Sequence, residues 1–280
     1  MMRTTRAVFP ALLLLAAACG GQQDTHAHDH AGHDHGHMAH YTGNGLTEVV
    51  HGYRLGEVSG PPTAGKTGRL SFRVYAPSGR TQTEFEIEQT KKMHVYVVRK
   101  DLMDFDHVHP EMAADGTWST PLTLEHPGPY RVVTEFLAKD DQGVTHHLVL
   151  GTDIEVPGAY QTATLPPPTS STAVDGYEVS VDGQPVAGRV SPLTLRFSRN
   201  GRPVTDLRPF LGAYAHLTGF HEGDLAVTHL HPEQQAAGDK PGGPKLDVAA
   251  QFLFPGRYRI YIQFQAGQTV HTAPITLQVR

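Results

Sequence analysis

Histidine is the residue type that stands out as a source of chemistry, because the chain carries 19 histidines among 280 residues. An unperturbed imidazole has a pKa near about 6.5, so at neutral pH most of the rings are uncharged and offer a nitrogen lone pair. Among metal ions, imidazole suits zinc and copper well. The histidines therefore predict a transition-metal ion, copper or zinc, as the cofactor of the chain.

A first group of histidines lies in a short polar stretch, residues 20–45, among Asp, Gly and Ala. This stretch has few apolar side chains to bury, so we expect it to be disordered. Flexible linkers usually consist of Gly, Ser, Pro or charged residues, so this composition favours metal binding over an incidental linker. The expected ligands are His26, His28, His30, His33, His35, His37 and His40.

A second group appears when the chain is compared with itself, because one unit occurs twice. His94 followed by the run from His107 to Pro110 matches His216 followed by the run from His229 to Pro232, with the same spacing. Three imidazoles on one face of a sheet form a recurrent ligand set for zinc or copper. We therefore expect one metal site in each copy. The expected ligands are His94, His107 and His109 in the first copy and His216, His229 and His231 in the second.

The expected geometry of each site depends on a hairpin. If Lys100-Asp101 is a two-residue loop, His94 lies opposite His107 and shares a face with His109; Glu222-Gly223 plays the same part in the second copy. A three-residue loop would reverse the parity and separate His94 from the other two. A purely structural role, in which the His-x-His-Pro run bonds a nearby loop, also remains open. His147 and His271 are candidates for a fourth ligand.

The fold class follows from short segments of alternating apolar residues between turn signals. This pattern is typical of a β-sandwich. We predict an all-β chain with two tandem immunoglobulin-like β-sandwich domains, at residues 46–158 and 174–280. The linker between them, residues 159–173, is rich in proline and favours an extended spacer, with the domains either apart or docked side by side.

The N-terminus has the features of an export signal. Arg3 and Arg6 precede a short apolar run, and three alanines stand directly before Cys19. The run is shorter than the roughly 20 apolar residues of a spanning helix. Residues 1–19 are therefore predicted to be a lipoprotein signal peptide, with Cys19 lipidated and the protein anchored to a membrane at the cell envelope, in the periplasm or on the outer face of the cytoplasmic membrane. Plain secretion is the alternative.

Several function classes are excluded or left without support by the sequence. The net charge of -5 and the lack of a basic stripe speak against nucleic acid as a partner. The run from Gly60 to Thr67 fits a phosphate-loop pattern, but it leads into an expected strand rather than a helix, so no nucleotide is expected. No serine nucleophile elbow, cysteine pair or calcium loop is present, so no catalytic residue is predicted and we expect no enzyme.

With these residues in view, the chain resembles a largely uncharacterised group of secreted bacterial proteins with two modules. The resemblance rests on the segment from Lys92 to Leu102 with Asp106 to Pro110, and on the segment from Phe210 to Leu217 with His229 to Pro232. More distantly the chain is similar to the CopC and YtkA-like copper-handling sandwiches of the periplasm. That likeness implies a sandwich fold and metal binding, but not the CopC ligand set, because the spacing of Asp141, Gly143 and His147 differs.

Together these patterns predict an extracytoplasmic lipoprotein that binds copper or zinc and buffers or delivers the ion. Its partners would be metal ions, the membrane through the N-terminal lipid, and a metal transporter or metalloenzyme. Two alternatives stay open. One is a structural or adhesive surface protein with incidental histidines, and the other is a zinc enzyme with three histidine ligands and an open coordination position.

Overall fold

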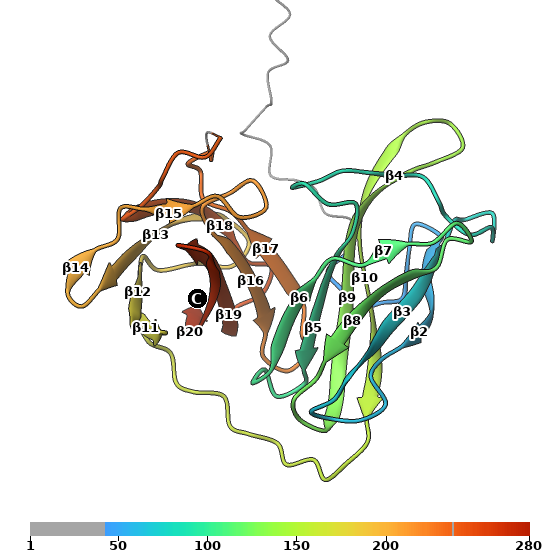
Figure 1. The fold of residues 1–280 in the computed structure, drawn as a ribbon, viewed down its shortest axis with the longest axis horizontal. Helices are drawn as coiled ribbons and strands as arrows, with labels where there is room; N and C mark the ends of the chain where they lie inside the picture. Colours follow the sequence, from blue (N-terminus) through green and yellow to red (C-terminus); the bar gives the residue numbers. More distant parts are fainter. Residues whose placement is uncertain (1–42, 237) are drawn as a thin grey trace, which may run out of the picture. The chain divides into compact units, whose positions relative to one another are not determined.

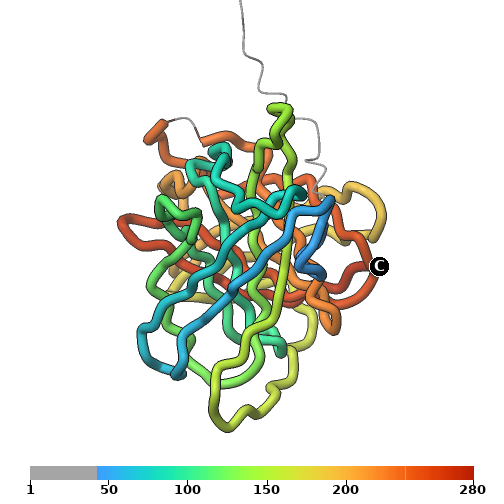
Figure 2. The backbone as a smooth tube through the Cα atoms, turned by 90° about the vertical axis from the view of Figure 1, so that its right-hand side faces the viewer, coloured from blue at the N-terminus to red at the C-terminus, as the bar shows by residue number. Residues whose placement is uncertain are grey.

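The computed structural model describes residues 43–236 and 238–280. Within these ranges every regular element is a β-strand and no helix is formed, which confirms the all-β prediction. The strands make four sheets, and each sheet takes its strands from only one half of the chain. Figures 1 and 2 trace this order, with the strands up to β10 in blue to yellow-green and the later strands in yellow to red.

The first β-sandwich is built from two antiparallel sheets, β1-β2-β3-β8-β7 and β10-β9-β5-β6, with β4 added on β9. Its strands are β1 (Val49–Val50), β2 (Tyr53–Ser59), β3 (Thr67–Tyr75), β4 (Phe85–Glu86), β5 (His94–Arg99), β6 (Phe105–Val108), β7 (Glu111–Met112), β8 (Trp118–Thr123), β9 (Gly128–Lys139) and β10 (Thr145–Val156).

The second β-sandwich has a related arrangement, with the sheets β11-β12-β13-β14, carrying β18 on β13, and β15-β19-β16-β17, carrying β20 on β19. Its strands are β11 (Ser171–Val174), β12 (Tyr177–Asp182), β13 (Val190–Arg199), β14 (Arg202–Pro203), β15 (Leu207–Arg208), β16 (His216–His221), β17 (Val227–Leu230), β18 (Lys245–Gln251), β19 (Gly256–Ala266) and β20 (Thr269–Val279).

Each sandwich has its own apolar core because side chains alternate across the faces of its strands. In β3, Leu70, Phe72 and Val74 point inward and are buried, while the residues between them are partly exposed. They pack against residues of the facing sheet such as Val95 and Val132. The second sandwich repeats this pattern around an equivalent cluster.

Strands β5 and β16 differ from the others because they are buried on both faces, apart from the partly exposed last residue of β16. Val95 and Val97 face the core of the first sandwich, whereas Tyr96 and Val98 belong to a third cluster. That cluster also contains Phe220 and Tyr261 from the second sandwich. The outer faces of the two sheets are therefore packed together, so the two sandwiches are docked side by side. The linker contributes Leu165 to the same cluster.

A buried tyrosine closes an equivalent corner in each sandwich, as the Pro-Gly-x-Tyr pattern suggests. The Tyr130 hydroxyl donates to the His126 carbonyl at 2.7 Å and to the Asp104 carboxylate at 2.9 Å. Tyr258 donates to the Phe254 carbonyl at 3.2 Å. These tyrosines stabilise the fold and lie on the sheets that carry the histidines.

Candidate metal centre

Two hairpins, β5-β6 and β16-β17, place the folded-domain histidines. Tyr96 pairs with His107 in the first hairpin and Thr218 with His229 in the second, so the predicted pairing of His94 with His107 is wrong by two residues. The first turn spans four residues rather than two, because Arg99 still pairs with Asp104 and Leu102 adopts a left-handed conformation with φ 64°. A shift of two preserves the parity, so His94, His107 and His109 share one face.

The first triad consists of His94, His107 and His109, whose ring nitrogens converge. His94 Nδ1 lies 3.2 Å from His107 Nε2 and 3.2 Å from His109 Nε2. For comparison, nitrogens about 2.0–2.1 Å from a tetrahedral zinc ion are separated by about 3.3 Å. The two distances from His94 therefore match the spacing of ligands around one metal ion, and all three ligand atoms lie within 4.8 Å of one another.

In His94 and His107, the ring nitrogen that points away from the triad has an oxygen as its hydrogen-bond partner. His94 Nε2 lies 3.1 Å from the Glu88 carbonyl oxygen, and His107 Nδ1 lies 2.8 Å from Gln263 Oε1. Both partners are acceptors, so the outward nitrogens carry the protons and the inward nitrogens of the neutral rings carry lone pairs. Two lone pairs that face each other at 3.2 Å repel unless a proton or a cation lies between them.

The second triad, His216, His229 and His231, repeats this arrangement, with ligand atoms that all lie within 4.8 Å of one another. His216 Nε2 donates to the Phe210 carbonyl at 2.8 Å, which leaves Nδ1 as the ligand atom. Among the described residues, buried His216 Nδ1 and His231 Nε2 have no hydrogen-bond partner. Buried polar atoms of this kind are rare, and a bound metal ion would satisfy them.

Burial keeps most of these rings neutral. Loss of solvent, followed by the charge of neighbouring histidines, lowers the pKa of His109 and of His216 to about 3 each. The same two causes lower the pKa of His107 and of His231 well below the usual value. Burial also lowers the pKa of His94. Neutral imidazole is the form that binds a metal, so the lone pairs are available at neutral pH.

Each sandwich supplies hydrogen-bond partners to the histidines of the other. His107 of the first sandwich donates to Gln263 of the second, as described above. His229 of the second donates from Nδ1 to Glu135 Oε2 of the first at 3.0 Å, and the Tyr96 hydroxyl donates to the same oxygen at 2.8 Å. Gln89 Nε2 of the first lies 3.3 Å from His231 Nδ1. The contact between the sandwiches therefore orients both triads.

His147, a candidate fourth ligand, belongs to a third group with Glu88 and Glu135. Its Nε2 lies 3.1 Å from Glu135 Oε1 and 3.2 Å from Glu88 Oε2. Burial would lower its pKa, but the hydrogen bond to Glu135 and the two carboxylate charges raise it. The structure thus places His147 behind Glu135, as an ion-pair partner and outside both triads.

His271, the other candidate fourth ligand, lies apart from the triads. Its Nδ1 lies 2.7 Å from Asp175 Oδ2, and its ring packs against Tyr177 and Phe264. His271 does not approach His216, although His271 aligns with His147 when the two copies are compared. The match between His147 and His271 in sequence therefore does not correspond to a common role.

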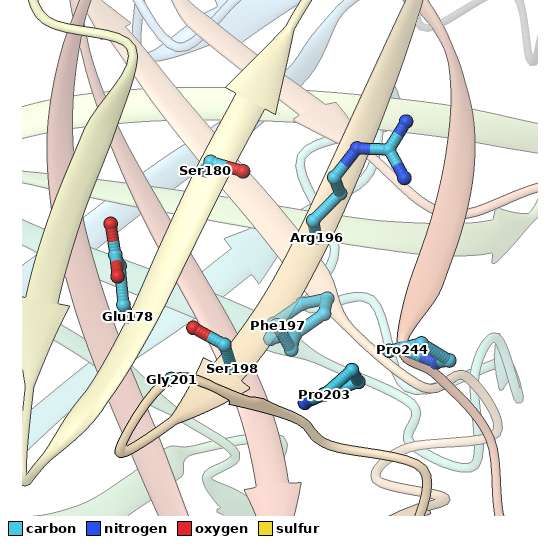
Figure 3. A pocket seen from close by; sticks show the side chains of 8 residues that line it. All are labelled: Glu178, Ser180, Arg196, Phe197, Ser198, Gly201, Pro203 and Pro244. Carbon is cyan, nitrogen blue, oxygen red and sulfur yellow. The ribbon is translucent and has the colours of Figure 1, made fainter.

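Met93 and a pocket on the second sandwich both lie away from the triads. Met93 precedes His94 but points to the opposite face, into the core of the first sandwich. A pocket of about 300 Å³ lies on the second sandwich and is lined by polar side chains, proline and Phe197, without any histidine (Figure 3). The run from Gly60 to Thr67 is a loop that leads into β3, which is inconsistent with a phosphate loop.

The predicted signal, Cys19 and the seven histidines from His26 to His40 lie outside the described residues. In the part of the chain that is described, no helix is long and apolar enough to cross a membrane. These predictions therefore rest on the sequence alone.

Sequence reasoning missed Glu135, Gln263 and Tyr96. A signal for the first two was present, because each is a polar residue within an otherwise apolar strand, and they occupy matching positions in the two copies. Glu135 pairs with His94 across β5 and β9, and Gln263 pairs with His216 across β16 and β19.

Three of the solved structures that match are distantly similar to the chain. A DUF3823 family protein from Parabacteroides merdae is 13% identical, with a TM-score of 0.23 over 76% of this chain and 98% of its own. A bacterial ice-binding adhesin is 13% identical, with a TM-score of 0.22 over 81% and 63%. A putative membrane anchored protein from Corynebacterium diphtheriae is 9% identical, with a TM-score of 0.22 over 81% and 58%. These scores are too low to support a function.

No curated protein matches the chain. A family match supports the expected resemblance to uncharacterised two-module proteins, whereas the relation to the CopC sandwiches is not shown. The family model described as a domain of unknown function (DUF8832) matches residues 48–153 and again residues 172–280, so the chain belongs to this family and carries its domain twice.

Proposed function

We propose that the protein binds transition-metal ions, Cu(II) or Zn(II), through its two histidine triads, and that it buffers or delivers them at the cell envelope. The observation that carries this proposal is the pair of inward lone pairs on His94 and His107, 3.2 Å apart, each fixed by an outward hydrogen bond to an oxygen. A metal ion is the partner that such an arrangement accommodates.

The donor set favours these ions over others. Each triad offers three imidazole nitrogens and no thiolate or thioether, which suits Zn(II), Cu(II) and Ni(II) better than Cu(I) or hard cations such as calcium. Three protein ligands leave one tetrahedral position for water or for a group of a receiving protein. That open position is compatible with transfer of the ion to a transporter or metalloenzyme.

The proposed place of action rests on the N-terminal sequence. Lipidation at Cys19 would hold the sandwiches at a membrane surface outside the cytoplasm, with the histidine-rich segment between anchor and folded part. The seven closely spaced histidines of that segment should take up ions weakly and exchange them quickly, whereas preorganised triads should hold them longer.

Metal stoichiometry of residues 41–280 tests the proposal, because this chain lacks the seven histidines of the N-terminal segment. We expect up to two ions per chain, measured by Zn(II) or Cu(II) titration followed by metal analysis after gel filtration. A folded protein that retains no ion would overturn the proposal and favour a structural or adhesive surface role.

A further inference from the structure

The two triads lie next to each other at the contact between the sandwiches. The ring centroids of His107 and His229 are 6.2 Å apart, as are those of His94 and His229, and those of His107 and His216 are 6.4 Å apart. Two divalent ions would therefore occupy one buried region, and the second ion would enter against the charge of the first. Under these conditions the two sites fill in an order, and the surrounding charges decide which site fills first.

The groups behind the triads are equivalent in position but different in charge. Glu135 pairs with His94 in the first sandwich and Gln263 pairs with His216 in the second. Each of the two side chains reaches across to the other sandwich, where Glu135 accepts from His229 and Gln263 accepts from His107. The two hydrogen bonds are equivalent in position, but His229 of the second triad bonds a carboxylate, whereas His107 of the first triad bonds a neutral amide.

Glu135 is almost completely buried, and three side chains direct donors at its carboxylate: His147 at Oε1, and His229 and Tyr96 at Oε2. His147 Nε2 lies between two carboxylates, 3.1 Å from Glu135 Oε1 and 3.2 Å from Glu88 Oε2. Oε2 of Glu135 remains the acceptor for His229. Gln263 is held as a neutral acceptor for His107, because its Nε2 donates to Thr272 at 3.3 Å.

We infer that the His216–His229–His231 triad is the tighter site and fills first, because Glu135 from the other sandwich acts as a positioning carboxylate behind His229. This inference rests on the proposed function. A carboxylate that accepts the outward proton of a ligand histidine fixes the ring and makes the inward nitrogen a better donor. Its negative charge also offsets part of the cost of burying a divalent ion among neutral ligands. In the first triad the outward nitrogens of His94 and His107 donate to a carbonyl oxygen and an amide oxygen instead of a carboxylate.

The test measures each site by itself in the full chain, with the seven histidines of the N-terminal segment changed to Ser. His107→Ala with His109→Ala leaves only the second triad, and His229→Ala with His231→Ala leaves only the first. Zn(II) affinity is measured in both backgrounds by competition with a chromophoric chelator. Glu135→Gln, which converts this position to the side chain found at Gln263, is then added to each background.

We expect the second triad to bind Zn(II) more tightly than the first. Glu135→Gln should weaken the second triad by about 10–100-fold and leave the first nearly unchanged. Glu86→Gln is the matched control, because it removes one negative charge near the same end of β9 and contacts Lys139 and Thr145 rather than a triad histidine. Thermal unfolding of the metal-free variants checks that each chain is folded.

The outcomes separate this inference from the proposed function. If neither background binds Zn(II), the proposed function fails. If both bind but Glu135→Gln changes neither site, changes both equally, or has the same effect as Glu86→Gln, the triads bind metal and the role of Glu135 is wrong. As a second variant, Gln263→Glu should tighten the first triad, and a loosened or unchanged site in a folded protein contradicts the inference.

Discussion

Nδ1 of His229 in the second sandwich lies 3.0 Å from Oε2 of Glu135 in the first, and both side chains are almost completely buried. A candidate ligand on one domain is thus held by a charged group on the other. Hydrogen bonds to charged groups contribute about 1.5–3 kcal/mol each. Docking of the domains and orientation of the triads therefore depend on the same residues.

The Tyr96 hydroxyl is part of this connection, since it donates to Glu135 at 2.8 Å and lies 2.6 Å from His229 Nδ1. We expect Tyr96→Phe to lower the free energy of unfolding by about 1–3 kcal/mol, because the buried carboxylate loses a donor. Urea denaturation of the metal-free protein measures the loss. The Tyr75 hydroxyl donates to Glu57 in an exposed hydrogen bond, so Tyr75→Phe should cost much less. Equal effects of the two substitutions would contradict the importance of Tyr96.

Paired alanine substitutions should remove the ions one at a time. His107→Ala with His109→Ala is expected to lower the stoichiometry of residues 41–280 by one ion, and His229→Ala with His231→Ala by the other. The apolar cores contain none of these rings, so each domain should stay folded. Metal analysis and far-UV circular dichroism check the two statements. If the double variants unfold and the affinity of the remaining sites for metal is unaltered, the triads have a structural role.

Buried neutral histidines should make the metal-free protein sensitive to acid. The pKa of His109 and of His216 is lowered to about 3 by burial, whereas an unfolded histidine titrates near about 6.5. Between these values the unfolded chain binds more protons, so this contribution to stability is complete above about pH 6.5 and is lost as pH falls toward 3. His147, with a raised pKa, contributes in the opposite sense, with stability lost as pH rises through that pKa.

Urea midpoints between about pH 8 and 4 measure this dependence. Changing His109 and His216 to Gln should flatten the decline, because two of the depressed groups are removed. The same decline in the variant would mean that other groups cause the loss.

Cys19 provides a test of the predicted anchor. Wild type should fractionate with membranes, and Cys19→Ser should release the protein, because a serine hydroxyl cannot form the thioether bond that joins the lipid to the cysteine sulfur. The prediction is wrong if wild-type protein is already found in the soluble fraction. Zn(II) binding at the two triads should be the same in the Cys19→Ser protein as in wild type.

The fold class could be predicted because the sequence repeats its turn signals and alternation. The alternation is visible in long strands such as β3, where Leu70, Phe72 and Val74 are buried and the residues between them are partly exposed. The face of the histidines was predicted correctly despite the wrong register, since an even shift keeps parity. The turn was misjudged because buried Asp101, which accepts from the Met103 amide and from Arg99, organises four residues.

The partners of the triads could not be predicted because self-comparison does not tell how one copy meets the other. Glu135 and Gln263 align as polar residues in apolar strands, which indicates a buried polar role but not its target. The target lies in the other sandwich for each of them. Only the docked arrangement shows that the difference between carboxylate and amide falls on two different triads.

Phe105 allows a last test of whether docking and metal binding are coupled. Its ring stacks on Tyr261 of the other sandwich, with centroids 4.1 Å apart and planes 11° apart, and such aromatic pairs contribute about 0.5–1.5 kcal/mol beyond the area they bury. Phe105→Ala should loosen the contact between the sandwiches without opening either core, because the ring packs against the shared cluster.

The expected result of Phe105→Ala is weaker Zn(II) binding at both triads, because Gln263, Glu135 and Gln89 then orient the histidines less well. Chelator competition measures the affinities, and limited proteolysis of the linker reports on docking. Phe254→Ala, at an exposed phenylalanine of the second sandwich, is the control and should change neither. If Phe105→Ala increases cleavage in the linker while both affinities stay at the wild-type value, each triad is preorganised by its own sandwich, and the hydrogen bonds between the domains serve docking alone.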